Sequence, residues 1–178
     1  MTESLRRVAI VGGSRIPFCR SNSLYADKSN LDMLSAAIDG VVERFSLAGE
    51  QLDEVMAGAV MTHSRDFNLA REAVLSSRLS PLTPGITMQQ ACGTSLQAAL
   101  NIGAKIATGQ IESGIAAGTD TTSDAPIVFS DRFAHRMINL SQARTMKQRL
   151  AALKGFGPGE LKPVSPTNGE MRTRLSMG

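Results

Sequence analysis

The sequence predicts an α/β fold in which a mostly parallel sheet carries helices on both faces. Short apolar runs that end in glycines or polar residues alternate with longer segments whose apolar residues recur every three or four positions. The connections between them are short, and this order is typical of parallel sheets, whose strands are covered on both sides. The 178 residues allow one domain of ordinary size with an appendage, but not two full domains.

Four strands are expected. Residues 6–13 (RRVAIVGG) form a β-branched apolar run that ends in two glycines, which predicts a buried first strand. Further strands are expected at residues 55–62 and 85–91. The fourth, residues 113–123, should run out into a polar loop.

Three helices are expected between these strands. Residues 29–47 place their apolar side chains on one helical face, and residues 67–79 follow with Asn68 as a candidate N-cap. The third helix, residues 92–109, ends at Gly109 and bears no charge over its first thirteen residues. We therefore expect this helix to be buried on more than one side.

After Pro126 the alternation stops. Residues 128–136 and 143–153 are candidates for short helices, and residues 155–170, rich in glycine and proline, are expected to form an exposed loop. We therefore predict an α/β domain over residues 1–126 and a separate region over residues 127–178.

Charge is distributed unevenly along the chain. Up to Ser130 there are 10 Lys and Arg residues against 13 Asp and Glu, and after it 9 against 3. The basic last quarter is compatible with an acidic membrane surface, a phosphate-bearing ligand or a simple solvated surface. We do not expect nucleic acid as a partner, because aromatic residues make up only 4% of the chain.

Cysteine usage indicates a reducing compartment. The two cysteines lie far apart, and neither a signal peptide nor a long apolar run is present, so a cytoplasmic protein is expected. The uncharged run over residues 79–104 is not a membrane span, because Gln and Asn interrupt it and its apolar residues are mostly small.

Cys92 is the candidate catalytic residue. It stands at the predicted junction of the third strand with the third helix and precedes Gly93. Unpaired N–H groups at a helix N-terminus favour an anion such as a thiolate, and they can stabilise an oxyanion on a carbonyl under attack. A packed, unreactive thiol is the alternative. Such a nucleophile needs a base, but His63 and His135 are both interpreted as ordinary loop or surface histidines.

Several ordered motifs resemble one family. They are AIVGGSRIPFCR, FNLAREAVL, QQACGTSLQAA, GIAAGTDTTSDAPIVFS, ARTMKQRLAAL and RLSMG. The chain resembles the N-terminal half of a thiolase, and specifically the thiolase component of fatty-acid β-oxidation complexes. The resemblance implies half of a five-layer α/β/α/β/α sandwich with part of an inserted loop domain. It also implies that Cys92 accepts the acyl group when 3-ketoacyl-CoA is cleaved with CoA to acetyl-CoA and a shortened acyl-CoA.

The resemblance also implies an incomplete site. In the family a base histidine, an oxyanion-hole histidine and an acid/base cysteine lie in the C-terminal half, which this chain lacks. Cys19 does not match that cysteine and is expected to be a packed thiol, and neither histidine matches the family's. We therefore expect no turnover by this chain alone. Met177, in RLSMG, is a candidate acyl-pocket residue, with plain packing as the alternative.

The expected partners follow from the same resemblance. They are CoA thioesters as substrates, a second copy in a homodimer or tetramer, and a hydratase/dehydrogenase subunit of a β-oxidation complex. Membrane contact is expected to be peripheral at most, and no metal or tightly bound cofactor is expected. Arg144, Lys147 and Arg149 are expected to attract CoA phosphates or a partner surface. A related ketoacyl or hydroxymethylglutaryl synthase, and a non-catalytic binding or assembly fragment, remain alternatives.

Overall fold

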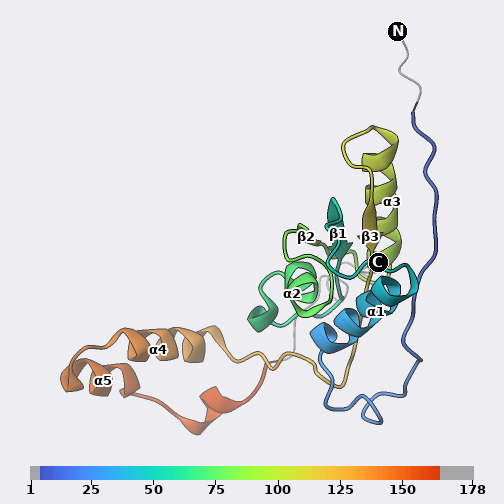
Figure 1. Ribbon diagram of the computed structural model, residues 1–178. Coiled ribbons are helices and arrows are strands. Elements are labelled where there is room, and N and C mark those ends of the chain that lie inside the picture. The colour runs from blue at the N-terminus through green and yellow to red at the C-terminus, as the bar shows by residue number, and fades with distance from the viewer. Residues whose placement is uncertain (1–4, 165–178) are drawn as a thin grey trace, which may run out of the picture. The chain divides into compact units, whose positions relative to one another are not determined.

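The computed structural model describes residues 5–164, which fall into two compact units that divide between Ala125 and Pro126 (Figure 1). Over the described residues, no helix combines the length and the apolar character that a membrane span requires.

A three-stranded parallel sheet lies at the centre of the first unit. The central strand β1 (Glu54–Ala57) pairs with β2 (Gly85–Thr87) on one side and β3 (Gly114–Ala116) on the other. Val55 stands opposite Gly85 and Ile115 in the register. These strands confirm three of the four predictions, although each is shorter than expected.

Helices cover both faces of this sheet (Figure 1). Val55 and Ala57 point toward α1 (Asn30–Arg44) and α2 (Leu69–Ser76) and join their apolar residues in the main core. Met56, with the opposite orientation, packs with Ala98 and Ile102 of α3 (Thr94–Ala107). Successive side chains of β1 point to opposite faces of the sheet, so this strand contributes to two apolar layers. The predicted fold class is confirmed.

Local signals set the helix ends. Ser29 and Asp32 form a capping box at the start of α1, and the Asn68 side chain accepts a hydrogen bond from Arg71 N at 3.1 Å at the start of α2. Gly109 follows α3 with φ +73°, a left-handed conformation that favours glycine. The Asn68 cap and the Gly109 end are confirmed, whereas α3 begins two residues later than expected.

The predicted first strand is wrong. Residues 6–13 adopt no regular structure, and the side chains of Ile10 and Val11 are 93% and 80% exposed. The segment passes the ends of two helices instead: Arg6 N donates to Ala107 O at 2.9 Å after α3, and Gly13 O accepts from Arg44 Nη1 at 3.0 Å beside α1. An apolar run needs a neighbouring strand to form a ladder, and no described strand lies beside this one.

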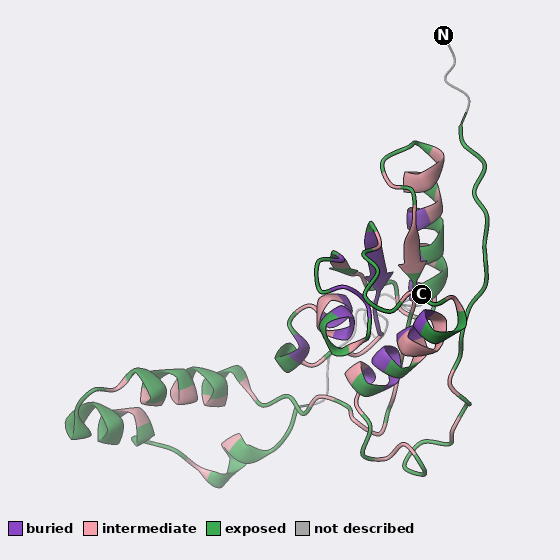
Figure 2. Ribbon diagram, viewed as in Figure 1, coloured by how far each residue is buried: buried purple, intermediate pink, exposed green. Residues whose placement is uncertain are grey.

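The predicted burial of α3 on more than one side is also wrong. Its buried residues, Thr94, Ala98 and Ile102, lie on the face toward β1 and β3. The side chains of Leu96 and Leu100 are 66% and 58% exposed, and Figure 2 shows green patches along this helix. The sheet covers one face, and residues 6–13 pass the helix at Gly103 and Ala107 without burying Leu96 or Leu100.

The second unit is a helical hairpin with no buried residue in its described part. It contains α4 (Asp131–Gln142), α5 (Met146–Leu153) and a short 3₁₀ turn, η2 (Pro158–Leu161), within the predicted loop. Phe133 lies between Phe129 and Phe156, with ring centroids 5.1 and 6.2 Å away. Both predicted short helices are present, with shifted ends.

Candidate active site

Cys92 lies in an exposed position between β2 and α3, with Gly93 as the N-cap of the helix. It borders a cavity of about 170 Å³ at the carboxyl end of the sheet. The residues that line this cavity are Gly58, Ala91, Cys92, Thr94, Ser95, Gly118, Thr119 and Asp120. The thiol is therefore accessible and stands at the start of a helix, as the sequence predicted.

The turn before Cys92 is strained and held by one side chain. Ala91 has φ +43°, a conformation that costs an L-residue on the order of 1 kcal/mol. The Thr94 hydroxyl accepts a hydrogen bond from Gln90 N at 2.8 Å and donates to Ala91 O at 2.8 Å. Gly93 N also donates to Gln90 O at 2.9 Å. This network fixes the backbone that presents the cysteine.

Two glycines let neighbouring backbones approach Cys92. Gly58 follows β1, where a Cβ would collide with Met88 O, and Gly118 follows β3, where a Cβ would lie 2.8 Å from Ser95 Cβ. Sequence reasoning did not single them out. The signal was available, because the carboxyl ends of parallel strands converge on one edge, where open α/β sheets bind ligands.

Asp120 is a second residue of the cavity that sequence reasoning missed. Its carboxylate accepts hydrogen bonds from Val60 N at 3.0 and 3.1 Å and from Met61 N at 3.5 Å. The residue thereby ties the loop after β3 to the loop after β1 on the rim of the cavity. Its position in GTD, where the predicted fourth strand (residues 113–123) turns polar, was the available signal.

This arrangement suits covalent chemistry at a carbonyl group. The accessible thiol can attack from the cavity, and N–H groups at a helix start that lack an intrahelical acceptor can stabilise the negative charge that develops on a carbonyl oxygen. The small residues 58 and 118 leave room for a substrate group next to the thiol. Among the described residues, none beside Cys92 is placed to act as its base.

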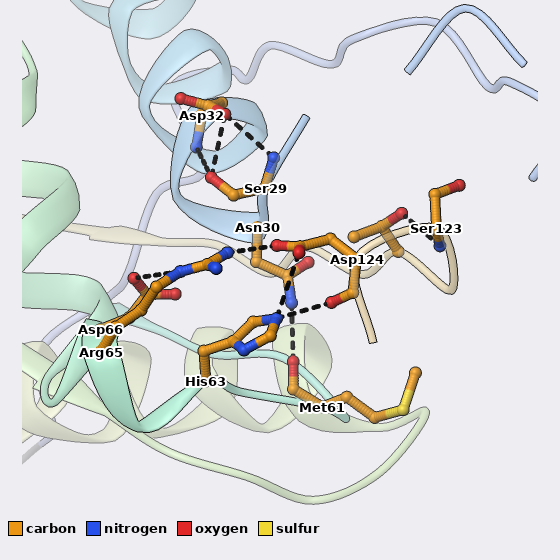
Figure 3. A network of polar contacts seen from close by, with 10 residues as sticks. Ser29, Asn30, Asp32, Met61, His63, Arg65, Asp66, Ser123 and Asp124 are labelled. Atoms are coloured by element: carbon orange, nitrogen blue, oxygen red, sulfur yellow. Dashed lines mark hydrogen bonds and ion pairs between the residues drawn. The ribbon is translucent and has the colours of Figure 1, made fainter. Parts of the chain in front are cut away.

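His63 is engaged in a different network (Figure 3). Its Nε2 lies 2.8 Å from Asp124 O and 3.3 Å from Asp124 Oδ1, and Arg65 forms an ion pair with the same carboxylate. In the described part of the chain no hydrogen bond joins it to Cys92. Its interpretation as a loop histidine fits this geometry.

Buried polar groups surround this histidine network. The Asn30 side chain donates to Met61 O at 2.6 Å, and its Oδ1 has no partner among the described residues. Asp66 is also buried, and its Oδ2 likewise has none there. The Asn30 hydrogen bond holds the loop after β1, and neither Asn30 nor Asp66 lines the cysteine cavity.

Two other candidates, His135 and Cys19, do not line the cysteine cavity. His135 is exposed on α4, in the second unit. Cys19 is half-buried, and a hydrogen bond with Ser23, whose Oγ lies 3.2 Å from Sγ, lowers the pKa of its thiol. Met177 lies outside the described residues. Over residues 5–164 no group of three or more potential metal ligands is found.

The basic residues of the last quarter were predicted as an anion-attracting set. Arg144, Lys147 and Arg149 are exposed, and the last two lie on α5. Within the described ranges none of the three belongs to an ion pair.

Comparison with known proteins gives concordant results. The family profile "Thiolase, N-terminal domain" matches residues 8–154. A 3-ketoacyl-CoA thiolase of Shewanella denitrificans is 36% identical over 172 residues, and one of Shewanella sediminis is 37% identical over the same length. In both cases the match covers 97% of this chain and 39% of the relative, so the chain spans well under half of these relatives.

A solved structure shares the fold. The acetyl-CoA acetyltransferase of Bacillus anthracis superposes with a TM-score of 0.68 over 72% of this chain and 33% of the other. The sequence identity of 22% makes this a likeness of fold alone.

Proposed function

This chain belongs to the thiolase family, whose N-terminal domain it contains, and we propose that Cys92 is its acyl-accepting nucleophile. The proposed reaction is cleavage of a 3-ketoacyl-CoA by CoA, or the reverse condensation. The proposal includes a cytoplasmic location and CoA thioesters as substrates, without a tightly bound cofactor.

One observation carries this proposal. Cys92 is exposed on a strained turn at the start of α3 and borders a cavity kept open by Gly58 and Gly118. A thiol retained only for packing would be buried. A nucleophile on a strained strand-to-helix turn is a recurring arrangement in acyl transfer.

The proposed chemistry proceeds in two acyl transfers. The Cys92 thiolate attacks the keto carbonyl, and the bond between Cα and Cβ breaks. Its electron pair passes to the departing acetyl-CoA enolate, which takes up a proton. The thiolate of free CoA then attacks the enzyme thioester, and Cys92 leaves as a thiolate.

Turnover needs more groups than this cavity offers. A base must deprotonate Cys92 and a donor must protonate the enolate, but His63 is bound to Asp124 instead. Removing single members of a group that acts as a unit costs most of the catalysis. We therefore propose that the 178 residues alone do not turn over, and that a second polypeptide portion supplies the missing groups.

An assembly role is the second candidate, and the exposed apolar surface favours it. Leu96 and Leu100 on α3, together with Ile10 and Val11, are more than half exposed. Exposed apolar surface of this kind marks interaction sites. We propose that this surface takes part in the expected homodimer or tetramer.

Acyl capture tests the nucleophile. The chain is incubated with acetyl-CoA or acetoacetyl-CoA, and peptide mass spectrometry locates the acyl group. We expect the adduct on Cys92, its loss in Cys92→Ala and its retention in Cys19→Ala, the matched control. If Cys92 stays unacylated and reacts no faster with iodoacetamide at neutral pH than in the unfolded chain, the assembly role is favoured.

Complementation tests the incomplete site. The chain is mixed or co-expressed with the portion of the Shewanella denitrificans relative that lies outside the match, and thiolysis of acetoacetyl-CoA is followed. We expect activity only in the mixture, and none when Cys92→Ala is used. Thiolysis by the 178 residues alone would show that the site is complete.

A further inference from the structure

Asp120 gives the cavity beside Cys92 a negative charge. Among the described residues that line this cavity, it alone has a charged side chain, and the others are small neutral residues and Cys92 itself. Asp120 is exposed, and no ion pair joins its carboxylate to a cation of residues 5–164. A group that enters the cavity therefore meets an anion that has no paired cation.

Backbone groups hold this carboxylate in place. Its Oδ1 accepts hydrogen bonds from Val60 N at 3.0 Å and from Met61 N at 3.5 Å, and its Oδ2 accepts one from Val60 N at 3.1 Å. Met61 is itself held, because its carbonyl oxygen accepts a hydrogen bond from the Asn30 side chain at 2.6 Å. The carboxylate therefore cannot rotate away from the cavity without losing these contacts.

The cavity is small enough for this charge to act on a group that reaches the thiol. A sphere with the cavity's volume of about 170 Å³ is roughly 7 Å across, which is less than the Debye length of about 8 Å at physiological ionic strength. Dissolved salt therefore screens the repulsion of a second anion in the cavity only in part.

We propose that Asp120 is a specificity-determining residue that admits uncharged acyl groups to Cys92 and excludes acyl groups that end in a carboxylate. The inference rests on the proposed role of Cys92 as the acyl acceptor. A carboxylate in the cavity would lose part of its hydration and face a like charge, and no cation in the described lining offsets either cost. An acyl chain that ends in a methyl group meets neither cost.

Two alkylating reagents of similar size test this charge without any need for acyl transfer. Iodoacetamide is neutral and iodoacetate is an anion, and with both reagents the Cys92 thiolate forms a C–S bond as iodide leaves. Peptide mass spectrometry measures both labelling rates on the full chain, and each is divided by the rate in the urea-unfolded chain. We expect Asp120→Asn to raise the iodoacetate rate relative to the iodoacetamide rate by roughly fivefold.

The two reagents also separate charge from loop structure. Asparagine keeps Oδ1, which accepts from both Val60 N and Met61 N, and removes the charge. A loosened loop would change both labelling rates together, whereas loss of the charge should change the iodoacetate rate alone. Asp27→Asn is the matched control, because it removes an exposed carboxylate that does not line the cavity, and it should leave the ratio unchanged.

A salt series on the unchanged chain gives a readout that needs no variant. Added salt should raise the relative rate of iodoacetate at Cys92, because it screens the repulsion by Asp120. The same salt series should have a much smaller effect in Asp120→Asn. A ratio that neither salt nor Asp120→Asn alters would overturn the proposal.

Acyl donors of equal length test the selection itself. Pentanoyl-CoA and glutaryl-CoA have acyl chains of the same length, but only the second ends in a carboxylate. With both donors the Cys92 thiolate attacks the thioester carbonyl, and CoA leaves as a thiolate. We expect pentanoyl-CoA to acylate Cys92 faster, and Asp120→Asn to reduce this preference by roughly fivefold.

The outcomes distinguish this inference from the proposed function. If neither donor acylates Cys92 while Asp120→Asn still raises the relative iodoacetate rate, the charge exclusion is supported and the acyl-accepting role fails. If Cys92 is acylated but Asp120→Asn changes neither the alkylation ratio nor the donor preference, the role of Asp120 is overturned and the nucleophile stands.

Discussion

The Thr94 hydroxyl and the Gln90 backbone N–H are joined by a hydrogen bond of 2.8 Å that closes the turn carrying Cys92. The same hydroxyl donates to Ala91 O, the carbonyl of the residue with positive φ. Thr94 is itself buried at the start of α3. One side chain thus connects the helix, the strained residue and the position of the thiol.

We expect Thr94→Val to disturb this turn. Valine keeps the shape but leaves Gln90 N–H without its acceptor and removes one of the two donors to Ala91 O, which should lower the free energy of unfolding by about 1–3 kcal/mol. The rate at which iodoacetamide labels Cys92 should change as well. Thr94→Ser keeps the hydroxyl and should restore the labelling rate; an equal effect of both variants would contradict the positioning role.

Replacement of Gly58 by alanine should lower stability much more than replacement of a glycine that has open space around it. A Cβ at Gly58 would collide with Met88 O and lie 2.9 Å from Thr94 Cγ2, so the backbone must shift. We expect Gly58→Ala to lower the unfolding free energy by about 3 kcal/mol or more. Gly13→Ala, where nothing lies within 4 Å of the added Cβ, is the control and should be nearly neutral in urea unfolding.

Asp53 should contribute to acid sensitivity. Hydrogen bonds from the backbone N–H groups of Glu112 and Ser113 lower the pKa of its carboxyl group. A carboxyl group with a lowered folded-state pKa stabilises the fold above its unfolded pKa, and this contribution is lost as the pH falls through the folded value. The loss of stability from about pH 5 to about pH 3 should therefore be smaller in Asp53→Asn.

Urea unfolding at the two pH values measures this difference. Asp27→Asn is the control, because in the described structure the exposed Asp27 carboxylate accepts no hydrogen bond. If Asp53→Asn shows the same acid dependence as the parent chain, the backbone contacts of Asp53 do not operate in solution.

The hairpin of the second unit should depend on Arg136. Its side chain and that of Glu160 are only 14% and 12% exposed. Arg136→Met keeps the stem but leaves the carboxylate and two helix-end carbonyls without their donor, which should cost about 2–4 kcal/mol of hairpin stability. We expect faster proteolysis between α4 and η2. Arg132→Met, one turn earlier and exposed, should digest like the parent.

Local chemistry explains the parts of the fold that were predictable. The Ser29 capping box, the Asn68 cap and the Gly109 end each involve contacts within a few residues, so the helices they bound can be recognised from sequence. The place of Cys92 between a strand and a helix is likewise a local property. Its role as a nucleophile stays a prediction.

Contacts between distant segments explain what was missed. Residues 6–13 have the composition of a buried strand, but strand formation depends on a partner far away in sequence, and this segment meets helix ends instead. The absence of charge in α3 likewise does not determine how many faces of this helix are covered by neighbouring segments. Both errors come from inferring tertiary neighbours from local composition.

The sequence by itself determined the helices, their caps, the order of strands and helices from α1 to β3, and an elbow cysteine, because these depend on periodicity and on contacts within one or two turns. Only the tertiary structure decided the strand order β2-β1-β3, which gathers Gly58, Cys92 and Gly118 around one cavity. It also decided that His63 contacts Asp124. Pairing across tens of residues depends on packing and loop closure, which leave no short-range signature in the chain.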